Sequence, residues 1–391
     1  MASHRIMFVM TPRFHHNEGG VQMTTYKLSK WLAQAGHVIG VFSFVKEGHV
    51  KAEFADIFLP EDSSGPSKNR NLDALARAVR QFRPDVVINQ MPYEHRIGHT
   101  LRKCNPPLLL GCLRNTLFSV KNNLDGFASR VLPKNVARLF QNPLGRAWLL
   151  SYHRKKHRRD LEKILETYDY FVMFAPQNLD ELSFFVPGFD HSKIKLIPNS
   201  IPSVQDQVPK KAKRLLWLGR VSAHQKRADL ILPLWEKIQP FLPDWELDVV
   251  GDGPALDDLS RSIAARSIKG VTLYGRQQPD GFFRRSAMYI MTSAFEGFPN
   301  TLIEAQSFGA VPVLFNSFPV AEFIVTDGVD GILVEPFDLK AMASRIVETI
   351  QTAKTSDIAS RALESARRFE IDMVGQMWEQ MFDDCLGQDG R

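Results

Sequence analysis

Glu296 and Glu304 lie eight positions apart, the first in a Gly-Phe-Pro-Asn loop and the second inside the helix predicted to follow it. The strand MYIMTS (288–293) leads into the loop, Pro299 suits a first helical turn, and Gly309 suits the helix end. Backbone N–H groups at such a helix start face an anion. Two carboxylates beside those N–H groups suit a ligand with two polyhydroxyl parts joined by phosphates, such as a nucleotide sugar. The helix dipole also favours a glutamate early in a helix when no ligand is bound. Taken alone, the two glutamates are therefore also consistent with a helix start that binds nothing.

Two cations follow an earlier predicted strand, where they could stabilise a diphosphate. Arg220 comes directly after RLLWLG (214–219), and Lys226 follows six residues later. When a sugar leaves a diphosphate, negative charge grows on the phosphate, and fixed cations lower the barrier by roughly a few kcal/mol. The 391 residues contain no Asp-x-Asp triplet that would hold a metal for the same task, so we expect no metal. Taken alone, the two residues are also consistent with a solvated basic loop.

The composition indicates a globular protein of two domains. The chain has 391 residues, of which 44% are hydrophobic and 24% charged, enough to bury sizeable cores. No apolar run is long enough to span a bilayer, and the N-terminus resembles a first strand, not a signal peptide. Three cysteines without Cys-x-x-Cys spacing, Cys104, Cys112 and Cys385, indicate reduced thiols in a cytoplasm. The net charge of +6 favours anionic partners.

Short apolar runs alternate with amphipathic helical stretches, which predicts an α/β fold with two doubly wound parallel sheets. Strands are predicted at 5–10, 38–44, 85–90, 107–113, 170–175 and 194–198, and again at 214–219, 247–251, 271–275, 288–293, 311–315 and 331–335. Helices are predicted at 21–36, 72–82 and 369–386, among others. A segment rich in Pro, Ser and charge separates the halves. The predicted domains are therefore 1–198 and 214–369, with a linker at 199–213 and a final helix, 370–391, that returns to the first domain.

The segment EGFPNTLIE (296–304), followed by AQSFGAVPV, resembles the Glu-x7-Glu signature of the family 4 retaining glycosyltransferases. Further segments resemble motifs of that family in the same order: Gly19 with Gly20, PNSIP (198–202), Gly219-Arg220 with Lys226, VGDGP (250–254), YGR (274–276) and DGVDGILV (327–334). The resemblance is strong over 214–335 and loose over 45–170. It implies the GT-B fold, in which two Rossmann-like domains face a central cleft.

The resemblance also implies roles for individual residues. Glu296 would hold the donor sugar, Glu304 the ribose, and Arg220 with Lys226 the diphosphate; Glu296, Arg220 and Lys226 would be catalytic. The implied donor-binding residues are Gly19, Gly20, Gly219, Gly251, Gly253, Arg276, Gly297, Phe298, Pro299, Asn300, Thr301, Leu302 and Glu304. The implied reaction needs no metal and retains the anomeric configuration. Taken alone, the glycines are equally consistent with turns, above all Gly251 and Gly253.

One position departs from the family pattern. Many members carry a histidine facing the sugar after the strand that corresponds to 107–113, and Arg114 takes that place here. An arginine can hydrogen-bond a hydroxyl or a phosphate, but it does not act as a base. We expect Arg114 and Asn115 to contact the acceptor or the sugar. We expect the same of His15 and His16 in the first loop of the chain, and the alternative for these two histidines is that they are loop residues without a ligand.

Two histidine pairs have helical spacing, His95 with His99 and His153 with His157. Neither pair lies in a His-Glu-x-x-His motif and no third ligand accompanies them, so we expect no metal site there.

The basic run HRKKHRR (153–159) follows the apolar stretch AWLLSY (147–152). Such a pattern suits attachment of residues 147–159 to an anionic membrane surface, where transferases for lipid-linked acceptors work, and a solvated helix face is the alternative. No aromatic interleaving accompanies the run, so a nucleic acid is not expected as a partner. We expect a cytoplasmic protein, peripheral on the inner face of the cytoplasmic membrane.

Together these features predict a hexosyltransferase that moves a sugar from a nucleotide diphosphate sugar to a glycan or glycolipid, in surface polysaccharide or lipopolysaccharide biosynthesis. Two alternatives stay open. A nucleotide-sugar epimerase of the same fold would interconvert sugars without an acceptor. A non-catalytic nucleotide-sugar-binding protein, for which Arg114 is the one hint, would bind a donor without turnover.

Overall fold

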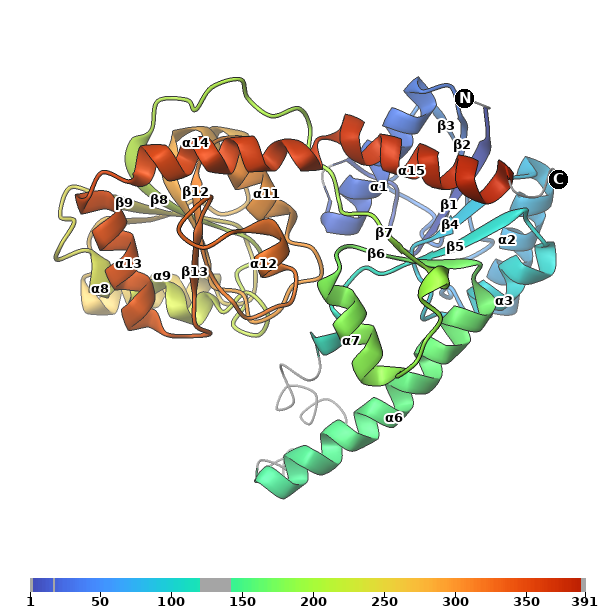
Figure 1. The fold of residues 1–391 in the computed structure, drawn as a ribbon, viewed down its shortest axis with the longest axis horizontal. Helices are drawn as coiled ribbons and strands as arrows, with labels where there is room; N and C mark the ends of the chain where they lie inside the picture. The colour runs from blue at the N-terminus through green and yellow to red at the C-terminus, as the bar shows by residue number, and fades with distance from the viewer. Residues whose placement is uncertain (1–2, 17, 120–141, 388–391) are drawn as a thin grey trace. The chain divides into compact units, whose positions relative to one another are not determined.

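The computed structural model describes residues 3–16, 18–119 and 142–387. The chain forms two compact units (Figure 1). Unit 1 comprises Met1–Leu117, Asn142–Ser200 and Ile371–Arg391, and unit 2 is formed mainly by Ile201–Glu370. Each unit is a parallel sheet covered by helices, as expected for strands that read as nearly continuous apolar runs.

Unit 1 is built on a seven-stranded parallel sheet with the order β3-β2-β1-β4-β5-β6-β7. Its strands are β1 (Arg5–Met10), β2 (Val38–Ser43), β3 (Ala55–Phe58), β4 (Val86–Asn89), β5 (Leu108–Cys112), β6 (Tyr170–Met173) and β7 (Ile194–Leu196). The strand order reverses between β1 and β4, where Phe8 pairs with Ile88. In open α/β sheets such a reversal opens a crevice at the carboxyl ends of the strands, where ligands bind.

Helices cover the sheet of unit 1, and the last of them comes from the far end of the chain. They are α1 (Gly20–Gln34), α2 (Asn69–Phe82), α3 (His95–Cys104), α6 (Pro143–Thr167), α7 (Gln177–Phe185) and α15 (Ile371–Leu386). Trp31 of α1 donates its indole N–H to Asp372 of α15 over 2.6 Å. A Cβ at Gly375 would lie 2.4 Å from the Trp31 ring, so only glycine allows this close approach. Figure 1 shows α15 beside α1.

Unit 2 is built on a six-stranded parallel sheet with the order β10-β9-β8-β11-β12-β13. Its strands are β8 (Ala212–Leu218), β9 (Glu246–Val250), β10 (Val271–Leu273), β11 (Ser286–Met291), β12 (Val311–Phe315) and β13 (Ile332–Val334). Its helices are α8 (Ile231–Ile238), α9 (Leu256–Arg266), α10 (Asp280–Arg285), α11 (Asn300–Ser307), α12 (Ala321–Ile324), α13 (Leu339–Gln351) and α14 (Thr355–Ala366). Here the order reverses between β8 and β11.

The predicted α/β class with two doubly wound sheets is confirmed, and all twelve predicted strands are present within a few residues of the expected bounds. One further strand, β3, was not predicted. It has four residues, lies at the edge of its sheet and is only partly buried. A strand of that kind carries almost no apolar pattern in the sequence.

Candidate functional site

In unit 2, the candidate site lies at the carboxyl ends of β8 and β11, where the strand order reverses. The loop after β8 carries Arg220 and Lys226, and the loop after β11 carries Glu296. Because these two strands are neighbours, the two loops meet. Ala294 N–H donates to the carbonyl of Gln225 over 2.7 Å, and Thr292 Oγ1 donates to the carbonyl of Lys226 over 2.7 Å.

Lys226 and Glu296 form an ion pair across these loops. Lys226 Nζ lies 2.7 Å from Glu296 Oε1, and the Gln225 amide donates to Oε2 over 3.3 Å. The Glu296 side chain is 8% exposed and that of Lys226 is 17% exposed. The carboxylate is thus desolvated and held by two donors, while the ammonium still reaches solvent. The sequence placed both residues at the site, but it did not reveal the pair or the role of Gln225.

Arg220 lies at the same edge with its side chain exposed. Among the described residues it makes no ion pair or side-chain hydrogen bond. The loop that carries it is held by backbone contacts: Gly219 N–H donates to the carbonyl of Val250, and Val221 N–H to that of Asp252. A free guanidinium on a fixed loop is available to a phosphate.

Gly251 and Gly253 support the Arg220 loop through their backbone. Gly251 has φ 141°, and a Cβ there would lie 1.8 Å from the carbonyl oxygen of Gly219. A Cβ on Gly253 would lie 2.4 Å from the carbonyl oxygen of Val221. Both glycines are therefore explained by close backbone packing. Arg276 follows β10, the edge strand of the sheet, and its side chain is exposed. Strand β9 lies between β10 and β8, the strand that leads to Arg220.

Helix α11 begins at Asn300, with Pro299 in the cap position before it. Phe298 and Leu302 point into the core, 7% and 0% exposed, so this segment offers a ligand its backbone and the side chains of polar residues. Tyr289 holds the helix start, with its hydroxyl 2.8 Å from Thr301 Oγ1. Burial raises the pKa of Tyr289 far above its usual value, so the hydroxyl stays protonated. Glu304 is partly buried on the second turn of the helix.

In unit 1, the predicted residues fall at the carboxyl edge of the other sheet. Gly19 caps the start of α1 with φ 61°, a conformation that suits glycine. His15 and His16 lie in the loop after β1 with their rings stacked, centroids 4.9 Å apart. Arg114 and Asn115 follow β5, which is separated from β1 by β4.

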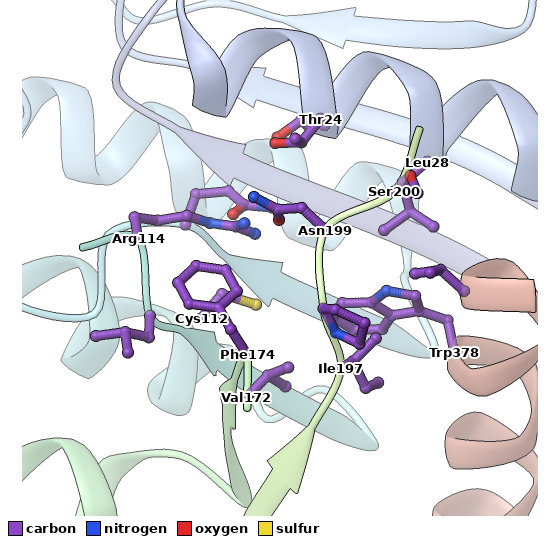
Figure 2. A pocket seen from close by; sticks show the side chains of 15 residues that line it. Thr24, Leu28, Cys112, Arg114, Val172, Phe174, Ile197, Asn199, Ser200 and Trp378 are labelled. Atoms are coloured by element: carbon purple, nitrogen blue, oxygen red, sulfur yellow. The ribbon is translucent and has the colours of Figure 1, made fainter. Parts of the chain in front are cut away.

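A pocket lies beside Arg114 within unit 1, lined by residues of α1, of α15 and of the segments that end β4 to β7. Figure 2 shows Arg114 reaching into it from the loop after β5, with Asn199 on the opposite wall. Gln90 and Thr25 are among the polar residues that line it, and the sequence analysis missed both. The signal for Gln90 was a polar residue directly after a buried strand, at the point where the order of the sheet reverses.

His95, His153 and His157 contact neighbouring side chains. His95 Nε2 lies 3.0 Å from Asp160 Oδ1. His153 and His157 stack on each other, and His157 also stacks on Tyr93. In the described part of the chain, no three His, Cys, Asp or Glu side chains are grouped as metal ligands. None of the helices in 3–16, 18–119 and 142–387 is both long and apolar enough to cross a bilayer.

Comparison with known proteins agrees with this geometry. A family model described as Glycosyltransferase Family 4 matches residues 18–203, and one described as Glycosyl transferases group 1 matches residues 212–352. The structure of the HepE protein from Anabaena, solved with UDP and glucose, superimposes with a TM-score of 0.71 at 14% identity, over 97% of this chain and 100% of that one.

Two curated relatives align with part of this chain. An exopolysaccharide phosphotransferase of Streptomyces coelicolor is 26% identical over 200 residues, which are 50% of this chain and 21% of that protein. A GDP-mannose:cellobiosyl-diphosphopolyprenol alpha-mannosyltransferase of Komagataeibacter xylinus is 28% identical over 183 residues, 44% of this chain and 46% of that one. The chain thus spans less than half of the length of either relative. With both of its halves matched by family models and a fold shared along its length, the chain belongs to the family 4 glycosyltransferases of the GT-B fold.

Proposed function

We propose that the chain transfers a hexose from a nucleoside diphosphate sugar to a glycan or lipid-linked acceptor, with retention of configuration and without a metal. The observation that carries this proposal is the Lys226–Glu296 pair beside the free guanidinium of Arg220, at the strand-order reversal of unit 2. The site offers both a desolvated carboxylate and two cations, as a sugar diphosphate requires. The alignment with a polyprenol-linked mannosyltransferase supports the acceptor class.

Each residue then has a part in the reaction. Glu296 accepts hydrogen bonds from sugar hydroxyls, and Glu304 accepts them from the ribose. The bond between the anomeric carbon and the β-phosphate oxygen breaks, and Arg220 with Lys226 stabilises the charge that grows on that oxygen. The acceptor oxygen bonds to the anomeric carbon from the same face. Its proton passes to the departing phosphate oxygen, because Arg114 cannot serve as a base.

Calorimetric titration with UDP, GDP, ADP and CMP tests the site first. One of the diphosphates should bind, and Glu304→Ala should weaken that binding by about tenfold or more, the worth of a hydrogen bond to a charged group. Glu364→Ala, on an exposed side chain of α14, is the matched control. If none binds, or if both variants bind like the wild type, the proposed donor site is wrong.

Product analysis then tests the chemistry. The preferred base selects the donor panel, and NMR of the anomeric proton in the product should show the configuration of the donor. Turnover should persist in excess EDTA. A product with inverted configuration would refute retention. Loss of turnover in EDTA that is restored by added Mg²⁺ or Mn²⁺ would refute metal independence.

We further propose that α6 rests on an anionic membrane surface, which would bring the enzyme to a lipid-linked acceptor. Leu144, Trp148 and Tyr152 are 84%, 56% and 48% exposed on its first turns, and the latter two rings stack with centroids 5.8 Å apart. Exposed lysines and arginines follow at 154–159. Aromatic and basic side chains together suit the interface of an anionic bilayer.

Vesicle flotation checks the membrane proposal. The protein should float with phosphatidylglycerol vesicles, less with phosphatidylcholine vesicles, and less again after Leu144→Ser with Trp148→Ser. Phe241→Ser, 63% exposed in unit 2, should change nothing. Equal flotation of both variants would exclude α6 as the contact.

A further inference from the structure

The pocket of unit 1 contains polar groups that the fold itself does not satisfy. It encloses about 420 Å³ of empty space, counting the part open to solvent. Its enclosed part is small, so a ligand would place a small polar group there and not a whole sugar ring. Its polar lining includes Arg114, Gln90 and Thr25, with Asn199 opposite Arg114 (Figure 2).

Two neutral side chains there are buried without hydrogen-bond partners. Gln90 is 4% exposed, and neither its amide nitrogen nor its amide oxygen has a partner; Thr25 is 2% exposed, and its Oγ1 has none. A buried polar group left unpaired destabilises the folded state, because it has lost its hydrogen bonds to water. Leucine and valine would fill these positions without that cost, so the polar groups point to something that enters the pocket.

Arg114 adds a charge that is also uncompensated. Its Nε is buried without a partner, and no carboxylate among the described residues pairs with it. Its side chain hydrogen-bonds the thiol of Cys112, and burial lowers the pKa of the guanidinium, although an arginine remains protonated. A partly buried cation without an anion is unfavourable, and an oxyanion brought by a ligand would neutralise it.

The loop after β5 holds Arg114 in place. Leu113 N–H donates to the carbonyl of Val172 over 2.8 Å. Thr116 Oγ1 donates to Glu181, a fully buried carboxylate that also accepts from Asn178 over 2.7 Å. The nearby acid is therefore engaged in fixing the loop and is not a counterion for Arg114.

We propose that this pocket binds an oxyanion of a substrate, a carboxylate or a phosphate, with Arg114 as the cationic ligand and Gln90 and Thr25 as neutral hydrogen-bonding groups. The proposal rests on the proposed function, because the oxyanion would belong to the transferred sugar or to the acceptor. It narrows the substrate to an acidic one: a uronic-acid sugar or a phosphorylated glycan.

NMR of ¹⁵N-labelled full-length protein tests this, with the arginine Nε–H signals as the readout. Arg114→Lys identifies the Arg114 signal. The titrations use D-glucuronate, inorganic phosphate and neutral D-glucose, each with a saturating nucleoside diphosphate so that the phosphate site of unit 2 is occupied. We expect glucuronate or phosphate to shift the Arg114 signal and to bind about tenfold or more tightly than glucose. Binding of glucuronate would indicate that the oxyanion is a carboxylate, and binding of inorganic phosphate would indicate that it is a phosphate.

Variants separate a binding role from a structural one. Gln90→Leu should raise the unfolding temperature, since it removes an unpaired buried amide, yet weaken binding of the anion. Arg114→Leu should abolish that binding, whereas Arg80→Leu, an exposed arginine of α2, should leave it unchanged. Because Gln90→Leu is expected to fold, the test does not depend on the folding of Arg114→Leu.

The outcomes distinguish this inference from the proposed function. If a nucleoside diphosphate binds but neither anion binds better than glucose, or if Gln90→Leu leaves anion binding unchanged, the pocket is a hydrated packing gap and the inference is wrong. If no nucleoside diphosphate binds at all, the proposed function fails first, and the anion titrations without a diphosphate still report on the pocket.

Discussion

We expect Lys226 to stabilise the fold of unit 2, in addition to its proposed contact with the diphosphate. Replacing it with methionine would leave the Glu296 carboxylate, 8% exposed, with only the Gln225 amide as a partner. An unpaired buried charge is costly, so Lys226→Met should lose about 3 kcal/mol of unfolding free energy together with turnover. Adding Glu296→Gln should restore most of the stability and none of the activity. Denaturant titration checks the first part and a turnover assay the second.

Arg220 should behave differently because it is exposed and has no partner in the described structure. Arg220→Met should change the unfolding free energy by less than about 0.5 kcal/mol. The turnover number should nevertheless fall by about a hundredfold or more, the effect of removing one fixed charge from a leaving phosphate. A large loss of stability with unchanged turnover would reverse the roles assigned to the two cations.

At the scale of single residues, the sequence indicates which chemistry is present but not which groups meet. Glu296, Lys226 and Arg220 were predicted for the site from residue type and motif. The ion pair joins residues 70 positions apart, and it depends on β8 lying beside β11, which no local pattern encodes. Gln90 and Thr25 were missed because neutral polar residues are common and become informative only once their burial is known.

At the scale of elements, the loop after β8 depends on a glycine of the next loop. Gly251→Ala would place a Cβ 1.8 Å from the Gly219 carbonyl at φ 141°. The strain should cost about 2–4 kcal/mol and move the Arg220 loop, so diphosphate binding should weaken as well. Gly281→Ala in α10 meets nothing within 4 Å and should be neutral or stabilising by about 0.5 kcal/mol. Thermal unfolding and calorimetry of both variants check the contrast.

The packing of α6 on α7 should make unit 1 sensitive to acid. Burial, together with the positive charge of His153, lowers the pKa of His157 to about 4, although Asp160 acts in the opposite direction. Because the pKa of His157 is lower in the folded state than in the unfolded state, the unfolded state binds more protons at pH values between the two. Stability should therefore fall as the pH drops from about 6.5 towards 4, by about 2 kcal/mol between pH 7 and pH 5.

His157→Gln isolates that contribution from the other buried histidines. Its unfolding free energy should depend less on pH over the same window, although it loses some stability at neutral pH with the stacking on Tyr93. His99→Gln, exposed on α3, is the control. Parallel pH profiles for wild type and His157→Gln would show that burial of this histidine does not govern the acid response.

Long periodic elements were predictable from the sequence, whereas short edges were not. The central strands have apolar runs bounded by turn residues, and their positions agreed within a few residues. The edge strand β3 was not predicted because it is short and half-buried. The pocket of unit 1 was not predicted for another reason. It is formed by the ends of four strands and two helices, and the distances between these ends cannot be read from the sequence.

At the scale of the whole molecule, the chain leaves unit 1 after Ser200 and returns to it at Ile371. The returning helix contributes Val374, Trp378, Met381 and Phe382 to the same core as β1 and β2. Each large buried side chain is worth about 2–5 kcal/mol. Their sum is comparable to the net stability of a domain, about 5–15 kcal/mol. Unit 1 should therefore not fold without α15, whereas, in the part of the chain that the structure describes, the core of unit 2 contains no residue of that helix.

Deleting residues 371–391 tests this dependence by scanning calorimetry. The truncated protein should lose the transition of unit 1 and keep that of unit 2, and a nucleoside diphosphate should raise the remaining transition temperature, because a ligand stabilises only the folded unit that binds it. Met373→Ala, 52% exposed on α15, should keep both transitions. If the truncated protein keeps both, α15 is an accessory to unit 1 and not part of its core. If the ligand no longer shifts the remaining transition, binding of the diphosphate needs unit 1, and the donor site cannot be assigned to unit 2 alone.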